Sequence, residues 1–124
     1  MSELEHFEVI RKRFLMKSAG FIQEKTILKN QTLYWQGDHI KNVYIILSGD
    51  FELKILLSEN WLNHLKDKYL TLSIVGKDKV LLFDDLINNN KTCSHTLVCW
   101  SDKGVLNSFP AADILMIVKK NRLI

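Results

Sequence analysis

The side chains best suited to chemistry gather in one short stretch of the second half of the chain. It holds two adjacent carboxylates, Asp84 and Asp85, followed by Cys93, Ser94 and His95. Two carboxylates can act as general acid and base when they face one another, but neighbours on an extended segment point to opposite sides. Cysteine and histidine in a Cys-x-His spacing supply two metal ligands, which is too few for a zinc site. His95 could instead line a pocket and titrate near neutral pH, or be an ordinary strand-edge residue.

A nucleophilic role for a cysteine also finds little support. Cys93 could be an exposed loop thiol, but Lys91 is its only near neighbour in the sequence that could lower its pKa. The remaining histidines, His6, His39 and His64, are dispersed and pair with neither cysteine at metal-ligand spacing. The sequence contains no Gly-x-Ser-x-Gly turn and no phosphate-binding loop. We therefore expect no enzyme, no metal and no cofactor.

Composition is that of an ordinary folded domain. The chain has 124 residues, 47% hydrophobic and 25% charged, which suffices for one core. The net charge of +3 comes from basic residues interleaved with acids, so no stripe for nucleic acid is expected. The sequence has neither a run long enough to cross a membrane nor a secretory signal. A disulfide between Cys93 and Cys99 would fold a strand back on itself, so we expect reduced thiols in the cytoplasm.

Short apolar or alternating runs separated by turn signals fill the middle of the chain. They predict strands over residues 26–28, 32–35, 43–47, 51–56, 69–75, 79–83, 96–101 and 105–108. Helical spacing of apolar residues predicts helices over 4–21 and 111–121. The predicted fold is mainly β, a double-stranded β-helix or jelly-roll β-barrel flanked by an N-terminal and a C-terminal helix. We expect a single domain over 1–124, with the roll over 26–108.

Two segments could contact something outside the roll. The helix over 4–21 has a basic face, which could be solvated while the apolar stripe packs on the core, or could touch a membrane or a partner. An insertion between two strands carries Trp61, Leu62 and Leu65, which could form one side of a short helix. These three side chains either fold back on the roll or present an anchor to a partner protein.

The stretch from Gly37 to Gly49 points to a family. A turn at Gly37-Asp38 is followed by a short gap, the apolar run 43–47 and a second turn at Ser48-Gly49. Together with Leu33, this spacing resembles the first signature of cyclic-nucleotide-binding domains, the β-roll module of catabolite activator protein, protein kinase A regulatory subunits and cyclic-nucleotide-gated channels. Tyr34 and Ile40 depart from the small or branched residues usual in the pattern. The resemblance implies the β-roll and extends over nearly the whole chain.

The second signature of that family holds its phosphate-binding cassette: apolar-Gly-Glu-x-small-apolar, a spacer of five to eleven residues, then Arg-Ser/Thr-Ala. Counting back five residues from Cys93-Ser94-His95 aligns Leu82 to Ile87 with the first part. A neighbouring register would align Asp84 with the Gly and Asp85 with the Glu, but it places polar Asn88 on an apolar position, so we prefer the first register. In this register Phe83 replaces the Gly that lets a backbone N–H approach the phosphate. Asp84 replaces the Glu that binds the ribose, with Asp85 following it. Leu86 replaces the small residue, Cys93 replaces the Arg and His95 replaces the Ala.

These replacements predict that the domain has lost cAMP and cGMP binding. Removal of a buried Arg–phosphate contact costs about 2–5 kcal/mol, and Asp84 adds negative charge near an anion. Lys91 could reach a phosphate as a point charge, but a solvated loop lysine fits its polar surroundings better. We expect a non-enzymatic structural or protein-interaction module. The alternative is a sensor of a small molecule, or weakly of a cyclic nucleotide, in a remodelled pocket.

The expected partner is another protein or the rest of a larger chain, rather than nucleic acid or a membrane. In the family a longer helix after the barrel covers the nucleotide and carries the allosteric change. This sequence ends at Ile124, soon after the predicted helix. We therefore expect either a domain cut from a larger protein or a domain that does not switch in the family's way.

Overall fold

A computed structural model of the chain describes residues 23–57 and 68–121. The predicted helix over 4–21 and the insertion with Trp61, Leu62 and Leu65 lie outside these residues. None of the helices in the described part is long and apolar enough to cross a membrane.

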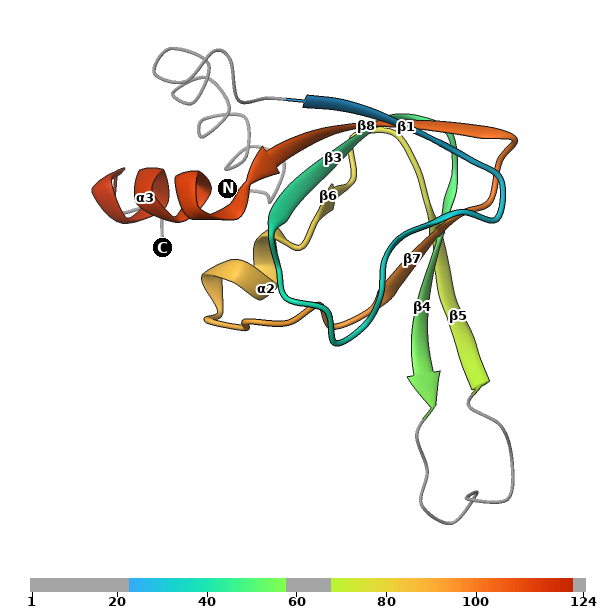
Figure 1. Cartoon of the computed structure of the whole chain (residues 1–124), viewed down its shortest axis with the longest axis horizontal. Helices are drawn as coiled ribbons and strands as arrows, with labels where there is room; N and C mark the ends of the chain where they lie inside the picture. Colours follow the sequence, from blue (N-terminus) through green and yellow to red (C-terminus); the bar gives the residue numbers. More distant parts are fainter. Residues whose placement is uncertain (1–22, 58–67, 122–124) are drawn as a thin grey trace.

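Eight strands in the described residues form two four-stranded antiparallel sheets (Figure 1). The first sheet has the order β1-β8-β3-β6 and the second the order β2-β7-β4-β5. The elements are β1 (Gln23–Leu28), β2 (Thr32–Tyr34), β3 (Asn42–Ser48), β4 (Phe51–Leu57), β5 (Lys68–Val75), β6 (Val80–Leu81), α2 (Phe83–Ile87), β7 (Thr96–Cys99), β8 (Lys103–Pro110) and α3 (Ala111–Asn121). The predicted mainly β jelly-roll fold is confirmed, except that the sheets do not close into a barrel.

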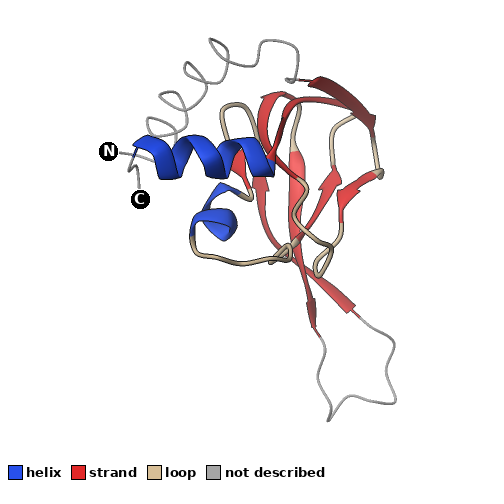
Figure 2. Ribbon diagram, turned by 60° about the vertical axis from the view of Figure 1, so that its left-hand side comes forward, coloured by secondary structure: helices blue, strands red, loops and turns tan. Residues whose placement is uncertain are grey.

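The central strand β3 is covered on both of its faces. Val43 to Ile46 are all buried, and alternate residues belong to two different core clusters. Val43 and Ile45 pack with α2 and α3, whereas Tyr44 and Ile46 face the space between the sheets. A continuous apolar run is what a strand buried on two sides requires. Figure 2 shows both helices on one side of the strands.

Both predicted tight turns exist at the ends of this strand region. Gly37 has φ 91° and Gly49 has φ 89°, a region of backbone space that favours glycine. A side chain at Gly49 would also meet the carbonyl oxygen of Lys103 at 2.6 Å. The first turn precedes β3, and the second leads the chain from β3 in the first sheet to β4 in the second.

The predicted strand over 79–83 is wrong in its second half. The strand ends after two residues as β6, because Leu82 adopts a left-handed conformation with φ 71°. The chain then enters α2, which has Asp84 and Asp85 in its first turn, where acidic residues suit the helix dipole. The predicted extended Asp84-Asp85 pair is therefore also wrong, since both residues are helical. The last strand is longer than predicted and runs directly into α3.

Strands β4 and β5 form a hairpin that projects from the body of the roll (Figure 1). Strand β5 lies at the edge of the second sheet, and β4 pairs on its other side with β7. The register of the hairpin shifts between Leu53 and Lys54, which leaves Leu72 in a bulge on β5.

Candidate functional site

The predicted cassette surrounds a small cavity at the N-terminal side of α2. The cavity measures about 290 Å³ and lies between β4, the end of β6, α2 and the start of β7. Its lining includes four of the predicted site residues: Asp84, Asp85, Ser94 and His95. The structure therefore brings these four together from two segments, and five further lining residues come from outside the predicted set: Leu53, Lys79, Val80, Leu81 and Leu82.

The Asp85 carboxylate closes the cassette loop onto itself. Its Oδ2 accepts hydrogen bonds from the backbone N–H of Ser94 at 3.2 Å and from the Ser94 hydroxyl at 2.8 Å. Its Oδ1 accepts a hydrogen bond from the side-chain amide of Asn90 at 3.1 Å. A carboxylate that accepts several such bonds is stabilised in its charged form and holds the donors in place. The donors at the start of β7 are thus satisfied within the chain.

His95 extends this network of hydrogen bonds to β2. The Ser94 hydroxyl gives its proton to Asp85, so its oxygen can accept from Nδ1–H of His95, 3.1 Å away. The other ring nitrogen, Nε2, then accepts a hydrogen bond from the Tyr34 hydroxyl. Burial lowers the pKa of His95, and the positive charge of Lys79 lowers it further, while Asp85 acts in the opposite direction. Burial likewise raises the pKa of Tyr34, which keeps its hydroxyl protonated.

The direction of these hydrogen bonds does not suit nucleophilic catalysis. An activated serine donates its proton to a histidine base, which a carboxylate orients from behind. Here Ser94 donates to the carboxylate of Asp85, and the imidazole of His95 donates to Ser94. In the described part of the chain, no group of three histidine, cysteine or acidic side chains could hold a metal ion. The network is arranged to fix the loop rather than to react.

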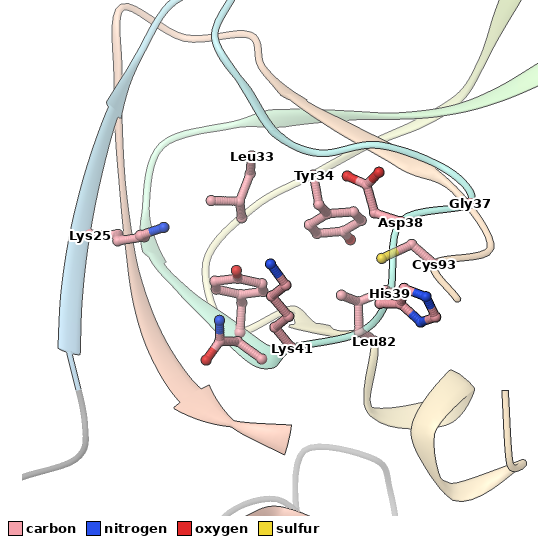
Figure 3. A pocket seen from close by; sticks show the side chains of 11 residues that line it. Lys25, Leu33, Tyr34, Gly37, Asp38, His39, Lys41, Leu82 and Cys93 are labelled. Atoms are coloured by element: carbon pink, nitrogen blue, oxygen red, sulfur yellow. The ribbon is translucent and has the colours of Figure 1, made fainter. Parts of the chain in front are cut away.

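Cys93 is a buried thiol, so the prediction of an exposed loop thiol is wrong. Only 3% of the residue is exposed, because its backbone pairs with the Gly37–Asp38 turn. Its N–H donates to the Asp38 carbonyl at 2.8 Å, and its carbonyl accepts from Gly37 N–H at 2.9 Å. Burial, with the nearby Asp38 and Asp85 carboxylates, raises the pKa of Cys93 to about 11. The side chain lines a different and larger cavity on the other side of the loop (Figure 3).

Three other predicted site residues also lie away from the small cavity. Phe83 and Leu86 belong to the core cluster that packs against α3. Lys91 is exposed and lines a groove beside α3. Sequence reasoning missed Tyr34 as the partner of His95. A signal was present, because Tyr34 is one of the two residues that depart from the small or branched side chains of the first signature.

The left-handed residue of the cassette is Leu82, and Phe83 has entered the helix. A glycine is favoured where φ is positive, so the backbone places the glycine-like position one residue before Phe83. A spacer of six residues before Cys93, within the range of the signature, gives this same alignment. Leu82 then corresponds to the Gly and Phe83 to the Glu, and in this register the ribose-binding carboxylate is missing altogether.

Comparisons with known proteins support the fold. No protein-family model matches the sequence, and no curated protein matches it. Among solved structures, Thermus thermophilus catabolite activator protein matches 96% of this chain and 48% of its own, at 18% identity and TM-score 0.66. The c-di-GMP-responsive global regulator CLP of Xanthomonas campestris matches 92% and 49%, at 15% identity and TM-score 0.67. PfPKA-R in its cAMP-bound form matches 96% and 36%, at 18% identity and TM-score 0.67.

The chain has the fold of a cyclic-nucleotide-binding domain, which confirms the resemblance drawn from the sequence. It spans about half the length of the first two of these proteins and about a third of the third. The identities are too low to carry more than the fold.

We predict that His95 makes stability depend on pH. Its pKa is lowered in the folded state, so below about pH 6.5 the unfolded chain binds a proton that the folded chain does not. The free energy of unfolding should be highest above pH 6.5 and fall as the pH drops below it. Urea denaturation at pH 7.5 and 5.5 should show that the free energy of unfolding falls less between these pH values in His95→Gln than in the wild type. The control is His39→Gln, at an exposed histidine. An equal fall in the free energy of unfolding in both variants would contradict the prediction.

We also predict that glycine is better tolerated than alanine at position 82. Alanine in a left-handed conformation costs about 1–2 kcal/mol relative to glycine. Both variants lose the same buried leucine side chain, so Leu82→Gly should unfold at a higher urea concentration than Leu82→Ala. At Leu81, which lies in β6, the order should be reversed, since glycine weakens a strand. The same order at both positions would place the glycine-like residue elsewhere.

Proposed function

We propose that this chain is a non-enzymatic, cytoplasmic domain that has lost cAMP and cGMP binding and acts as a structural or protein-interaction module. The observation that carries this proposal is the contact of Asp85 with Ser94. The backbone N–H and the hydroxyl of Ser94 are the donors that point from the start of β7 toward the small cavity, and both already bind the chain's own carboxylate.

A cyclic phosphate would have to compete with that carboxylate. An anion entering the cavity would meet the charge of Asp85, which like-charge repulsion disfavours, and would have to displace two hydrogen bonds. The position of the family's arginine holds a neutral thiol, Cys93, whose side chain faces another cavity. A missing charge-assisted contact to phosphate corresponds to roughly two to four orders of magnitude in affinity. Both alignments of the cassette lead to this same conclusion, since neither supplies Gly or Arg.

The projecting hairpin supports an interaction role. Leu70, Leu72 and Ile74 on β5 are 47%, 52% and 48% exposed, at the free edge of the second sheet. Apolar side chains on an edge strand favour association unless something covers them. The bulge at Leu72 disturbs regular strand addition, so we infer that a partner contacts the side chains. The segment with Trp61, Leu62 and Leu65 lies between β4 and β5 in the sequence and outside the described residues, and its contact with a partner stays a prediction.

The lengths of the similar structures support a place within a larger assembly. This chain covers half or less of each compared protein, which leaves room for further domains in those proteins. The partner that we propose is therefore another protein or the rest of a longer chain. The alternative function is a small-molecule sensor. The observation that favours it is the cavity beside the cassette, whose volume of about 290 Å³ is near the lower end of the usual range for ligand pockets.

We predict that neither cAMP nor cGMP produces saturable shifts in an NMR titration at millimolar concentration, because Asp85 holds the Ser94 donors. Saturable shifts of Leu82, Asp84, Ser94 and His95 in the wild type would contradict the proposal. Ser94→Ala would then test whether they report binding at the cassette, with Ser48→Ala, at an exposed serine, as the control. Shifts caused by an unrelated metabolite at the same residues would favour the sensor instead.

We further predict that the β5 surface determines which proteins the domain binds. The double variant Leu72→Ser/Ile74→Ser should capture at least about tenfold less of a native partner from extract, since buried apolar anchors dominate interfaces. Substitution of exposed residues should leave the free energy of unfolding within about 0.5 kcal/mol of the wild type. The control Leu28→Ser/Met116→Ser removes two exposed apolar side chains elsewhere. Equal capture by both variants would contradict an interaction role for this surface.

A further inference from the structure

We propose that the larger cavity, at the end of the roll beside the Gly37–Asp38 turn, binds a small organic anion with an apolar body. The cavity measures about 580 Å³, which lies within the usual range for small-molecule sites. Its walls come from β1, β2, β3 and the loop between β2 and β3 (Figure 3). It shares only Leu82 with the lining of the cassette cavity, so the inference does not depend on the proposed loss of nucleotide binding.

Two ammonium groups supply the charge for an anion. Lys25 comes from β1 and Lys41 from the loop before β3, and Figure 3 shows both side chains reaching into the opening from different walls. Neither forms an ion pair with any residue of 23–57 or 68–121. The opposing carboxylate is Asp38, whose Oδ2 already accepts a hydrogen bond from the backbone N–H of Trp35 at 3.0 Å. Two cations against one engaged carboxylate leave the cavity electropositive.

A buried phenol adds a directed donor to these charges. Tyr44 is only 6% exposed and lines the cavity, as does Asn42. Burial raises the pKa of Tyr44, so the hydroxyl keeps its proton. No described residue accepts that proton. Buried polar groups normally find a partner, and a carboxylate or phosphate oxygen in the cavity would provide one.

The rest of the lining is suited to an apolar or aromatic body. Leu33 and Leu82 contribute aliphatic surface, Tyr34 contributes its ring, and Cys93 contributes a neutral thiol. The rings of Tyr34 and Tyr44 lie nearly parallel, with centroids 5.9 Å apart and planes 16° apart. Rigid aromatic walls with a few converging polar groups are typical of small-molecule sites. The chemical class that fits is an aryl or short alkyl carboxylate or phosphate ester.

The test is an NMR titration of the full chain with phenyl phosphate and with benzoate. We expect saturable shifts at Lys25, Leu33, Tyr44 and Cys93 at millimolar concentration. Neutral benzyl alcohol and inorganic phosphate should each bind at least about tenfold more weakly, because each lacks one half of the recognised chemistry.

Two double variants distinguish the effect of Lys25 and Lys41 from that of a general loss of positive charge. Lys25→Gln/Lys41→Gln should weaken binding of phenyl phosphate at least about tenfold, while the control Lys29→Gln/Lys103→Gln carries the same loss of charge outside the cavity and should bind as the wild type does. Tyr44→Phe keeps the ring and should weaken binding a few-fold, which keeps the proposal testable if the double variant folds poorly.

Four outcomes would overturn the proposal. One is the absence of saturable shifts with either anion, and another is equal weakening in the two double variants. The third is a set of shifts confined to Leu53, Asp84 and Ser94, which would instead bear on the cassette and on the proposed function. Equal binding of benzyl alcohol would show that the cavity recognises the apolar body without the anion, which also contradicts the proposal.

Discussion

The burial of β3 on both faces is the constraint on which the other features depend. Val43 and Ile45 anchor the helices on one side, and Tyr44 and Ile46 form the floor of the space between the sheets on the other. Any slip of one residue along this strand would exchange the two sets and put Tyr44 under α3. The glycine turns at Gly37 and Gly49 prevent such a slip by fixing both ends of the region. The position of each cavity follows from this register, because Tyr44 can line the larger one only from the inner face.

The cassette region keeps the apolar positions of the fold while its polar positions differ from the family's signature. The apolar positions of this region, among them Leu81, Phe83 and Leu97, remain in the core and hold the sheets and α2 together. The polar positions now satisfy one another, as Asp85 binds Ser94 and His95 links Ser94 to Tyr34. The bonds between Asp85 and Ser94 are exposed, and they hold the loop together by engaging its own donors. The proposed loss of cyclic-nucleotide binding rests on these same contacts.

The parts of the fold that the sequence predicted are those set by local pattern. The apolar run of β3, its flanking glycine turns and the two-part family signature are visible in the residues themselves. The left-handed conformation of Leu82 is not, since leucine rarely adopts it and nothing local demands it. The helix α2 has only five residues, too few to show a helical period, so the sequence predicted no helix there and extended the preceding strand to Phe83. The errors on that strand and on the Asp84-Asp85 pair followed from this one backbone turn.

Contacts between segments far apart in the sequence explain the features of the site that the sequence did not predict. Tyr34 and His95 are 61 residues apart, and they meet only because β2 pairs with β7 in the second sheet. Cys93 is buried for the same reason, as the turn at Gly37 and Asp38 pairs with the loop before β7. This pairing separates the small cavity lined by Ser94 and His95 from the larger cavity lined by Cys93 and Tyr44. The proposed loss of cassette chemistry on one side of the loop and the proposed anion site on the other are therefore compatible, because the two cavities are lined by different side chains of the same backbone, apart from Leu82.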